Sequence, residues 1–259
     1  MVLPPLLAEI RTSHIWGLPP CVTVGGHRID ALLLFIVGLT VAVFVGTQAV
    51  FVASLIKWRH RPGVAAHHTH GHAGAEFVWT AIPAAIFLGL FLYSDRLWFQ
   101  LRTPPPDGAA LDVEIVGEQF DWLVRYPGAD GKLGRADAAW ETPANHIGLD
   151  ASDPLGKDDF VLRNELVVPL GRPVHLHLRS RDVIHSVYLP EFRLYQDLVP
   201  GRTVNWVSFT ADRAGQFSLA CSQLCGSGHG TMQGRVRVVP AAEFDRWYQD
   251  EEKAKGGTP

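Results

Sequence analysis

Residues 221–232 read CSQLCGSGHGTM, and they lie between two β-prone runs, 216–220 and 235–239. This loop holds two thiols, an imidazole and a thioether, a soft ligand set that favours copper over oxygen-seeking cations. Its three glycines allow it to fold tightly around a centre. A further ligand must come from elsewhere, and His185, directly after Asp182, Val183 and Ile184, is the best candidate. The loop therefore predicts a copper site carried by a β-domain.

More β-prone runs fill the chain on both sides of this loop. Their regular spacing between turn residues predicts a β-sandwich or barrel. The polar segment 130–158 is predicted to be a long loop, and the spacing of Phe244, Trp247 and Tyr248 predicts a closing helix. The predicted strands are 113–116, 119–126, 160–168, 174–178, 204–209, 216–220 and 235–239.

Two uncharged runs precede the β-domain. Residues 31–56 form a run of 26, and residues 77–93 form a run of 17. A membrane-spanning helix needs about 20 apolar residues, with a range of about 17 to 25. The pair therefore predicts a transmembrane helical hairpin over 31–100, which a stiff proline spacer at 104–106 separates from the outer domain.

The loop of this hairpin, 57–76, is basic. Lys57, Arg59 and Arg61 have no acidic neighbour before Glu76, so the positive-inside rule places the loop in the cytoplasm. Residues 1–30, an external N-terminal segment, and the domain 101–259 are then expected on the periplasmic side of a bacterial inner membrane. The first thirty residues lack the apolar stretch of an ordinary signal peptide, so the anchor accounts for export.

Charge narrows the possible functions. Residues 101–259 carry 17 basic and 22 acidic side chains, a net charge of −5. No basic aromatic patch suggests nucleic-acid binding, whereas an acidic face accelerates the encounter with a basic soluble partner. No constellation of acid, base and nucleophile points to bond-making chemistry in this chain.

The second cysteine of the loop decides the kind of copper site. A blue-copper site needs one cysteine, so Cys221 and Cys225 together suggest two thiolates that bridge two copper ions. Sharing one electron over two ions lowers the structural reorganisation that electron transfer requires, so such a site suits electron relay. A disulfide and a structural zinc site are alternatives, but neither uses Met232.

Other cysteine and histidine residues are assigned no role. Cys21 stands alone, and His175 and His177 are predicted to face solvent from one strand. Four further histidines in the hairpin loop are read as a solvated linker, namely His67, His68, His70 and His72.

Together these residues resemble subunit II of haem-copper cytochrome c oxidases. That family's ligand loop, Cys-x-Glu-x-Cys-x3-His-x2-Met, is matched at 221–232 except at Gln223, and its Asp-Val-Ile-His-Ser segment is matched at 182–186. Further matches lie at 76–80, 117–122 and 200–202. The resemblance implies a cupredoxin-like Greek-key sandwich with the binuclear copper centre called CuA.

The resemblance also implies a role for each ligand. Cys221 and Cys225 would bridge the two coppers. His185 and Met232 would complete one copper, while His229 and the backbone carbonyl of Gln223 would complete the other.

At three further positions the resemblance implies a role, or the sequence departs from the family pattern. Phe120 stands where the family has the tryptophan that receives electrons from cytochrome c, and Trp122 is kept nearby. Glu76 matches a glutamate at the mouth of a proton path shared with subunit I. The family's glutamate in the ligand loop also contacts a magnesium ion at the subunit I interface, and the neutral Gln223 weakens the expectation of magnesium here.

The implied function is that of a cytochrome c oxidase subunit. It would accept electrons from cytochrome c or a similar carrier and pass them to haem in subunit I, which also holds CuB and reduces oxygen. Subunit III is an expected neighbour. The alternatives are the CuA-bearing subunit of a nitric oxide reductase and a membrane-anchored copper-carrier protein.

Overall fold

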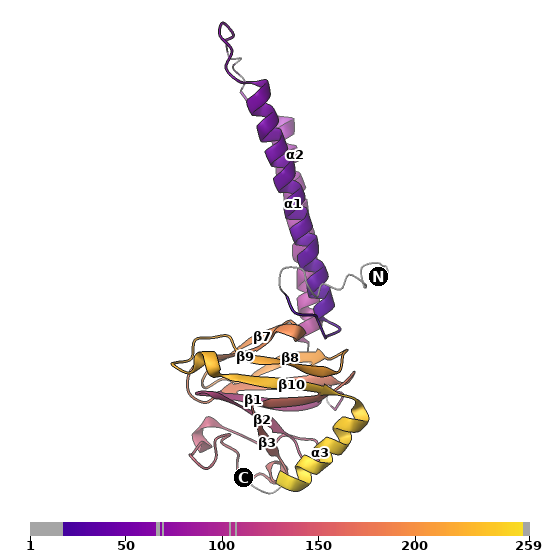
Figure 1. The fold of residues 1–259 in the computed structure, drawn as a ribbon, viewed down its shortest axis with the longest axis vertical. Helices are drawn as coiled ribbons and strands as arrows, with labels where there is room; N and C mark the ends of the chain where they lie inside the picture. Colours follow the sequence, from indigo (N-terminus) through magenta and orange to yellow (C-terminus); the bar gives the residue numbers. More distant parts are fainter. Residues whose placement is uncertain (1–17, 66–67, 69, 104, 107, 256–259) are drawn as a thin grey trace. The chain divides into compact units, whose positions relative to one another are not determined.

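The computed structural model describes residues 18–65, 68, 70–103, 105–106 and 108–255 (Figure 1). Two compact units make up this part of the chain. One is the helical unit Ile29–Gln100, and the other combines the described residues that precede and follow it. The predicted spacer begins at Pro104, which lies outside the described residues, as do residues 1–17 of the N-terminal segment.

Two long helices form the first unit. Helix α1 spans Gly26–Lys57 and helix α2 spans Ala73–Arg102, so both extend beyond the uncharged runs of the sequence. Both are long and apolar enough to cross a membrane, and their most apolar 18-residue windows are only 6% and 0% buried. Apolar side chains exposed on every face are what a lipid environment stabilises. The two predicted helices are thus confirmed as candidate membrane spans.

Two five-stranded sheets stack as the layers of a sandwich (Figure 1). Pairing within each sheet is antiparallel except between β1 and β5 and between β4 and β10. The first sheet has the order β3 (Phe160–Arg163), β2 (Asp121–Tyr126), β1 (Leu111–Glu118), β5 (Pro173–Ser180), β8 (Val204–Thr210). The second has the order β4 (Glu165–Pro169), β10 (Gln233–Val239), β9 (Gly215–Cys221), β6 (His185–Leu189), β7 (Leu194–Leu198).

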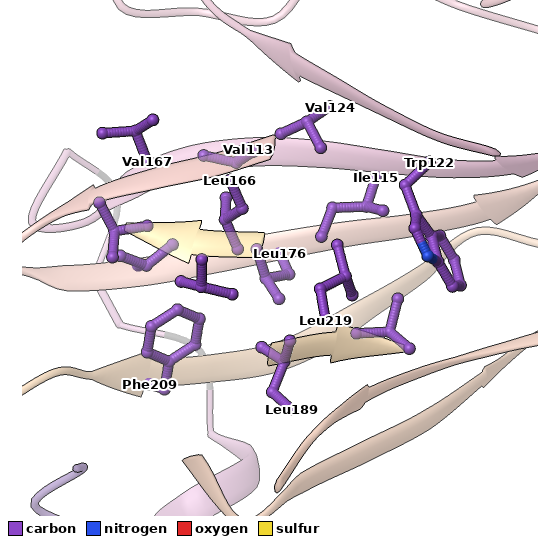
Figure 2. Close-up of a cluster of buried hydrophobic side chains, with 14 of the residues drawn as sticks. Val113, Ile115, Trp122, Val124, Leu166, Val167, Leu176, Leu189, Phe209 and Leu219 are labelled. Carbon is purple, nitrogen blue, oxygen red and sulfur yellow. The ribbon is translucent and has the colours of Figure 1, made fainter. Parts of the chain in front are cut away.

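Alternate side chains of the facing sheets fill the core. Figure 2 shows Ile115, Leu176 and Leu219 converging between the layers, and each is buried. Burying a side chain of this size stabilises the fold by about 1.5–3 kcal/mol. Helix α3 (Ala241–Lys255), the predicted closing helix, adds the buried Phe244 to this core.

The predicted strand 160–168 is in fact two strands in different sheets. Asn164 separates β3 from β4 with a left-handed φ of 59°, a conformation that asparagine tolerates better than most residues. Its side-chain oxygen accepts the backbone N–H of Trp122 at 2.8 Å. Strands β6 and β7 were not predicted, because their mixed polar composition gives no clear alternation.

The chain before α1 is also part of the sandwich. Val22 is fully buried in the core, and its backbone pairs with Glu191 and Asp212 at 2.9 and 3.0 Å. Thr23 forms a β-bridge with Ala211. A fragment that begins after α2 would therefore lose part of the core.

The predicted loop 130–158 covers the outer face of the first sheet. It contains two short 3-10 helices, Ala138–Trp140 and Pro154–Gly156. Arginines of the sheet hold it down, because Arg125 donates to the carbonyl of Gly134 at 2.9 Å and Arg179 donates to that of Ile147 at 2.5 Å. The segment therefore has a defined conformation and covers the buried charged side chains on the outer face of the first sheet.

Candidate metal centre

The ligand loop connects two neighbouring strands of the second sheet. Cys221 ends β9, Met232 lies just before β10, and the N–H of Cys221 donates to the carbonyl of Met232 at 3.1 Å. His185 begins β6, whose Val187 pairs with Cys221. Sheet pairing therefore brings a histidine that is 36 residues away in the sequence to the loop.

All six predicted ligand residues converge at this end of the sheet. The Sγ atoms of Cys221 and Cys225 are 3.8 Å apart, too far for a disulfide of about 2.05 Å. The remaining donor atoms all lie within 4 Å of one of these sulfurs. They are His185 Nδ1 (3.9 Å) and the Gln223 carbonyl oxygen (3.2 Å) near Cys221, and His229 Nδ1 (3.7 Å) and Met232 Sδ (3.8 Å) near Cys225.

These donors fit copper. His185, Cys225 and Met232 are nearly or fully buried, and three sulfurs with two ring nitrogens form a soft set. Burial, followed by the neighbouring Cys221 thiol, raises the pKa of Cys225 to about 11. Such a thiol ionises at neutral pH only when a cation takes the place of its proton.

Asp182 orients His185. The Nε2–H of His185 donates to the Asp182 carboxylate at 2.7 Å, which leaves the lone pair of Nδ1 directed towards Cys221. Burial opposes ionisation of Asp182, but hydrogen bonds from His185 and two backbone N–H groups outweigh it and hold its pKa below the usual value. On the other side of the ring, a Cβ on Gly117 would approach the ring of His185 to 3.0 Å.

Gln119 and Phe120 hold the loop from the first sheet. The Gln119 side chain donates to the carbonyl of Cys225 at 2.6 Å. The ring of Phe120 packs against two loop glycines, since an added Cβ would lie 3.1 Å from it at Gly226 and 2.4 Å at Gly228. Gly226 also has a φ of +133°, which other residues rarely adopt. Sequence patterns assigned Gln119 no role, because it contacts the loop only across the two sheets.

We predict that Gly228→Ala weakens copper binding by about 10-fold and destabilises the fold by about 1–3 kcal/mol, because the new methyl group overlaps the Phe120 ring. Gly230→Ala is the matched control, since a Cβ there meets nothing within 4 Å. Copper content after gel filtration and thermal melting measure both effects. Equal behaviour of the two variants would contradict the packing argument.

The residues predicted to receive electrons and the residue predicted at the mouth of the proton path differ in their exposure to solvent. Trp122 is fully buried and makes a T-shaped contact with the His185 ring at 6.1 Å, whereas Phe120 is only partly buried. Leu224 of the ligand loop is 78% exposed. Glu76 lies in the first turn of α2 and is exposed.

Two groups of histidines outside the ligand set were predicted to face solvent or to form a solvated linker. His175 and His177 do lie on the outer face of the first sheet, but their side chains are only 15% and 27% exposed and both contact Asp112. His68 and His70 are exposed in the hairpin loop, while His67 lies outside the described residues. Cys21 is buried beside Thr23, away from the ligand loop.

Comparison with known proteins gives consistent matches. The family model for the periplasmic domain of cytochrome c oxidase subunit II matches residues 111–239. An alternative cytochrome c oxidase subunit 2 from Bradyrhizobium diazoefficiens is 33% identical over 93% of this chain and 86% of its own. A cytochrome c oxidase subunit 2 from Cereibacter sphaeroides is 30% identical over 90% and 77%. The solved periplasmic domain of cytochrome oxidase subunit II from Bradyrhizobium japonicum is 29% identical, covers 59% of this chain and 99% of its own, and has a TM-score of 0.43.

Proposed function

Because this chain belongs to the cytochrome c oxidase subunit II family, whose members are subunits of a haem-copper oxidase, we propose that it relays electrons through a CuA centre in its outer domain. The observation that carries the proposal is the convergence of six donor residues at one end of the second sheet. The oxidase relatives do not favour the nitric oxide reductase alternative.

Two copper ions would be held by this set. Cys221 and Cys225 would bridge them, with His185 and Met232 on one ion and His229 and the carbonyl of Gln223 on the other. When bound, such a pair supplies one-electron transfer with little rearrangement of its ligands. Magnesium is not part of the proposal, because the neutral and exposed Gln223 side chain offers no carboxylate, which is the usual protein ligand of Mg²⁺.

The surrounding residues keep the site rigid and dry. Asp182 holds the His185 ring in one tautomer, and Gln119 and Phe120 fasten the ligand loop to the first sheet. Buried Met232 and Trp122 exclude water from the inner side. Ligands that do not move when the charge changes are what fast electron transfer requires.

The exposed side chains around the site suggest where an electron donor would bind. The exposed Leu224 and the partly buried Phe120 would offer apolar contacts to cytochrome c or a similar donor, and the acidic charge of the domain would attract a basic carrier. Trp122 would act behind this surface, because it is fully buried. Electrons would pass to haem in subunit I, with subunit III as a further neighbour and Glu76 at the entrance of a proton path.

The chain connectivity supports a membrane topology. Residues on both sides of the helical unit belong to the sandwich unit, so a chain that crosses a membrane with α1 must return with α2. The basic loop 57–76 would then lie in the cytoplasm of a bacterial cell, with both termini and the sandwich in the periplasm.

Electron paramagnetic resonance tests the proposal directly. We expect the full chain, purified in detergent and loaded with copper, to show the hyperfine pattern of one electron shared by two copper nuclei. The full chain is required because Val22 fills the sandwich core. A pattern from a single copper nucleus would overturn the binuclear assignment and favour a copper-carrier protein.

A further inference from the structure

A second cluster of ligand side chains lies on the outer face of the first sheet, outside the ligand loop. It consists of Asp112 on β1 and of His175 and His177 on the adjacent strand β5. The parallel register pairs Asp112 with His175 and Glu114 with His177. Because side chains alternate between the faces of a sheet, Leu111, Val174 and Leu176 point into the core while these three residues point outward.

The donor atoms of the cluster converge on a single oxygen. Asp112 Oδ1 lies 3.0 Å from His175 Nδ1 and 2.8 Å from His177 Nε2. Ligands around a tetrahedral zinc ion with bonds of about 2.1 Å are separated by about 3.4 Å. The two oxygen–nitrogen distances are about half an ångström shorter than this separation, and all three ligand atoms lie within 4.8 Å of one another, so small side-chain rotations would place them around one ion.

A backbone carbonyl fixes the ring of His175. Metal-ligating histidines are commonly held in this way, with the second ring nitrogen donating to a carbonyl or carboxylate oxygen. His175 Nε2 lies 2.6 Å from the carbonyl oxygen of Asn205 on β8. A carbonyl can only accept, so Nε2 donates and Nδ1 is the nitrogen directed at the cluster.

We infer that Asp112, His175 and His177 form a binding site for a borderline divalent cation of the Zn²⁺ class. Two imidazoles and one carboxylate are a ligand set that suits zinc. The three side chains are 33%, 15% and 27% exposed, so an ion can enter and a water molecule can complete its coordination. Hydrogen bonds from the two histidines hold the pKa of Asp112 well below its usual range, which keeps it ionised.

The site would fasten β1 to β5. These two strands pair in parallel, whereas β1 pairs with its other neighbour, β2, in the antiparallel sense. This assignment does not depend on the proposed copper function.

Zinc binding is tested on the full chain in detergent with Cys221→Ser and Cys225→Ser, which removes the thiolates that would also take up zinc. We expect one zinc ion per chain by elemental analysis after gel filtration, and a rise in melting temperature on zinc addition. His177→Ala and the isosteric Asp112→Asn should each weaken binding by at least about 100-fold, since even loss of an outer-shell contact costs 10-fold to 100-fold.

His27→Ala is the matched control, because His27 forms a similar pair with Asp212 at 2.9 Å but belongs to no group of three such ligands among the described residues. It should bind zinc as the parent does. Melting without zinc checks that each variant is folded, and the wild-type chain preloaded with copper should bind the same single zinc. The assignment would be overturned if neither the Cys221→Ser, Cys225→Ser chain nor the copper-loaded wild-type chain retained zinc. Unchanged zinc retention in His177→Ala and Asp112→Asn would also overturn it.

Discussion

Cys225→Ser is expected to abolish the shared-electron copper signal and electron acceptance by the chain completely. Cys225 is 3% exposed, and its sulfur lies within 4 Å of Cys221 Sγ, His229 Nδ1 and Met232 Sδ. A serine oxygen is a harder and smaller donor that cannot bridge two soft ions. Electron paramagnetic resonance and the rate of reduction by a cytochrome c both measure the loss.

Cys21→Ser provides the control for this substitution. Cys21 is buried to the same degree, but its neighbours are Thr23 and backbone atoms of the N-terminal segment. We expect the signal and the reduction rate to stay at the parent values. A binuclear signal that survives Cys225→Ser would contradict the assignment of this residue as a bridging ligand.

The second large effect concerns a buried charge network between the first sheet and its cover. Arg125 is 3% exposed and contacts Glu114 at 2.7 Å and Asp159 at 2.5 Å. Arg179 contacts the other oxygen of Glu114 at 2.8 Å. Burial opposes ionisation of Glu114, but the two guanidinium groups outweigh it and hold its pKa below the usual value.

Arg125→Met is therefore expected to destabilise the sandwich unit by about 3–5 kcal/mol, because it leaves buried Asp159 without its guanidinium partner and Glu114 with Arg179 alone. It also removes the bond that holds the covering segment at Gly134. Denaturant unfolding followed by tryptophan fluorescence measures the change. Adding Asp159→Asn should restore part of the loss, since the uncompensated charge is then removed.

Arg235→Met is the matched control in the other sheet. Arg235 also pairs with a glutamate, Glu165, at 3.1 Å, but its side chain is 62% exposed. Exposed ion pairs contribute about 0–1 kcal/mol. A difference between the two arginine variants of less than about 1 kcal/mol would contradict the view that burial makes the Arg125 network important.

The fold class could be predicted because its signals are local. Uncharged runs are visible in the sequence of α1 and α2, and most strands alternate regularly between turn residues. The exceptions have physical reasons. The break at Asn164 depends on a hydrogen bond to Trp122, and the contribution of Val22 to the core depends on contacts with Glu191 and Asp212, far along the chain.

The candidate copper centre was predictable to a similar extent. Five of its six ligands lie within twelve residues, so their spacing alone indicates a soft metal site. His185 could be named only as a candidate, because sheet pairing brings it to Cys221. The supporting contact from Gln119 crosses between the sheets and left no sequence signal.

The sequence by itself determined the apolar helices and the composition of the ligand loop, because both depend on residues that are neighbours along the chain. Only the tertiary structure decided that Asp112 meets His175 and His177, and that Arg125 meets Asp159. These side chains come from separate strands and loops. Their distances are set by strand register and by the covering segment, which exist only after the sheets have formed.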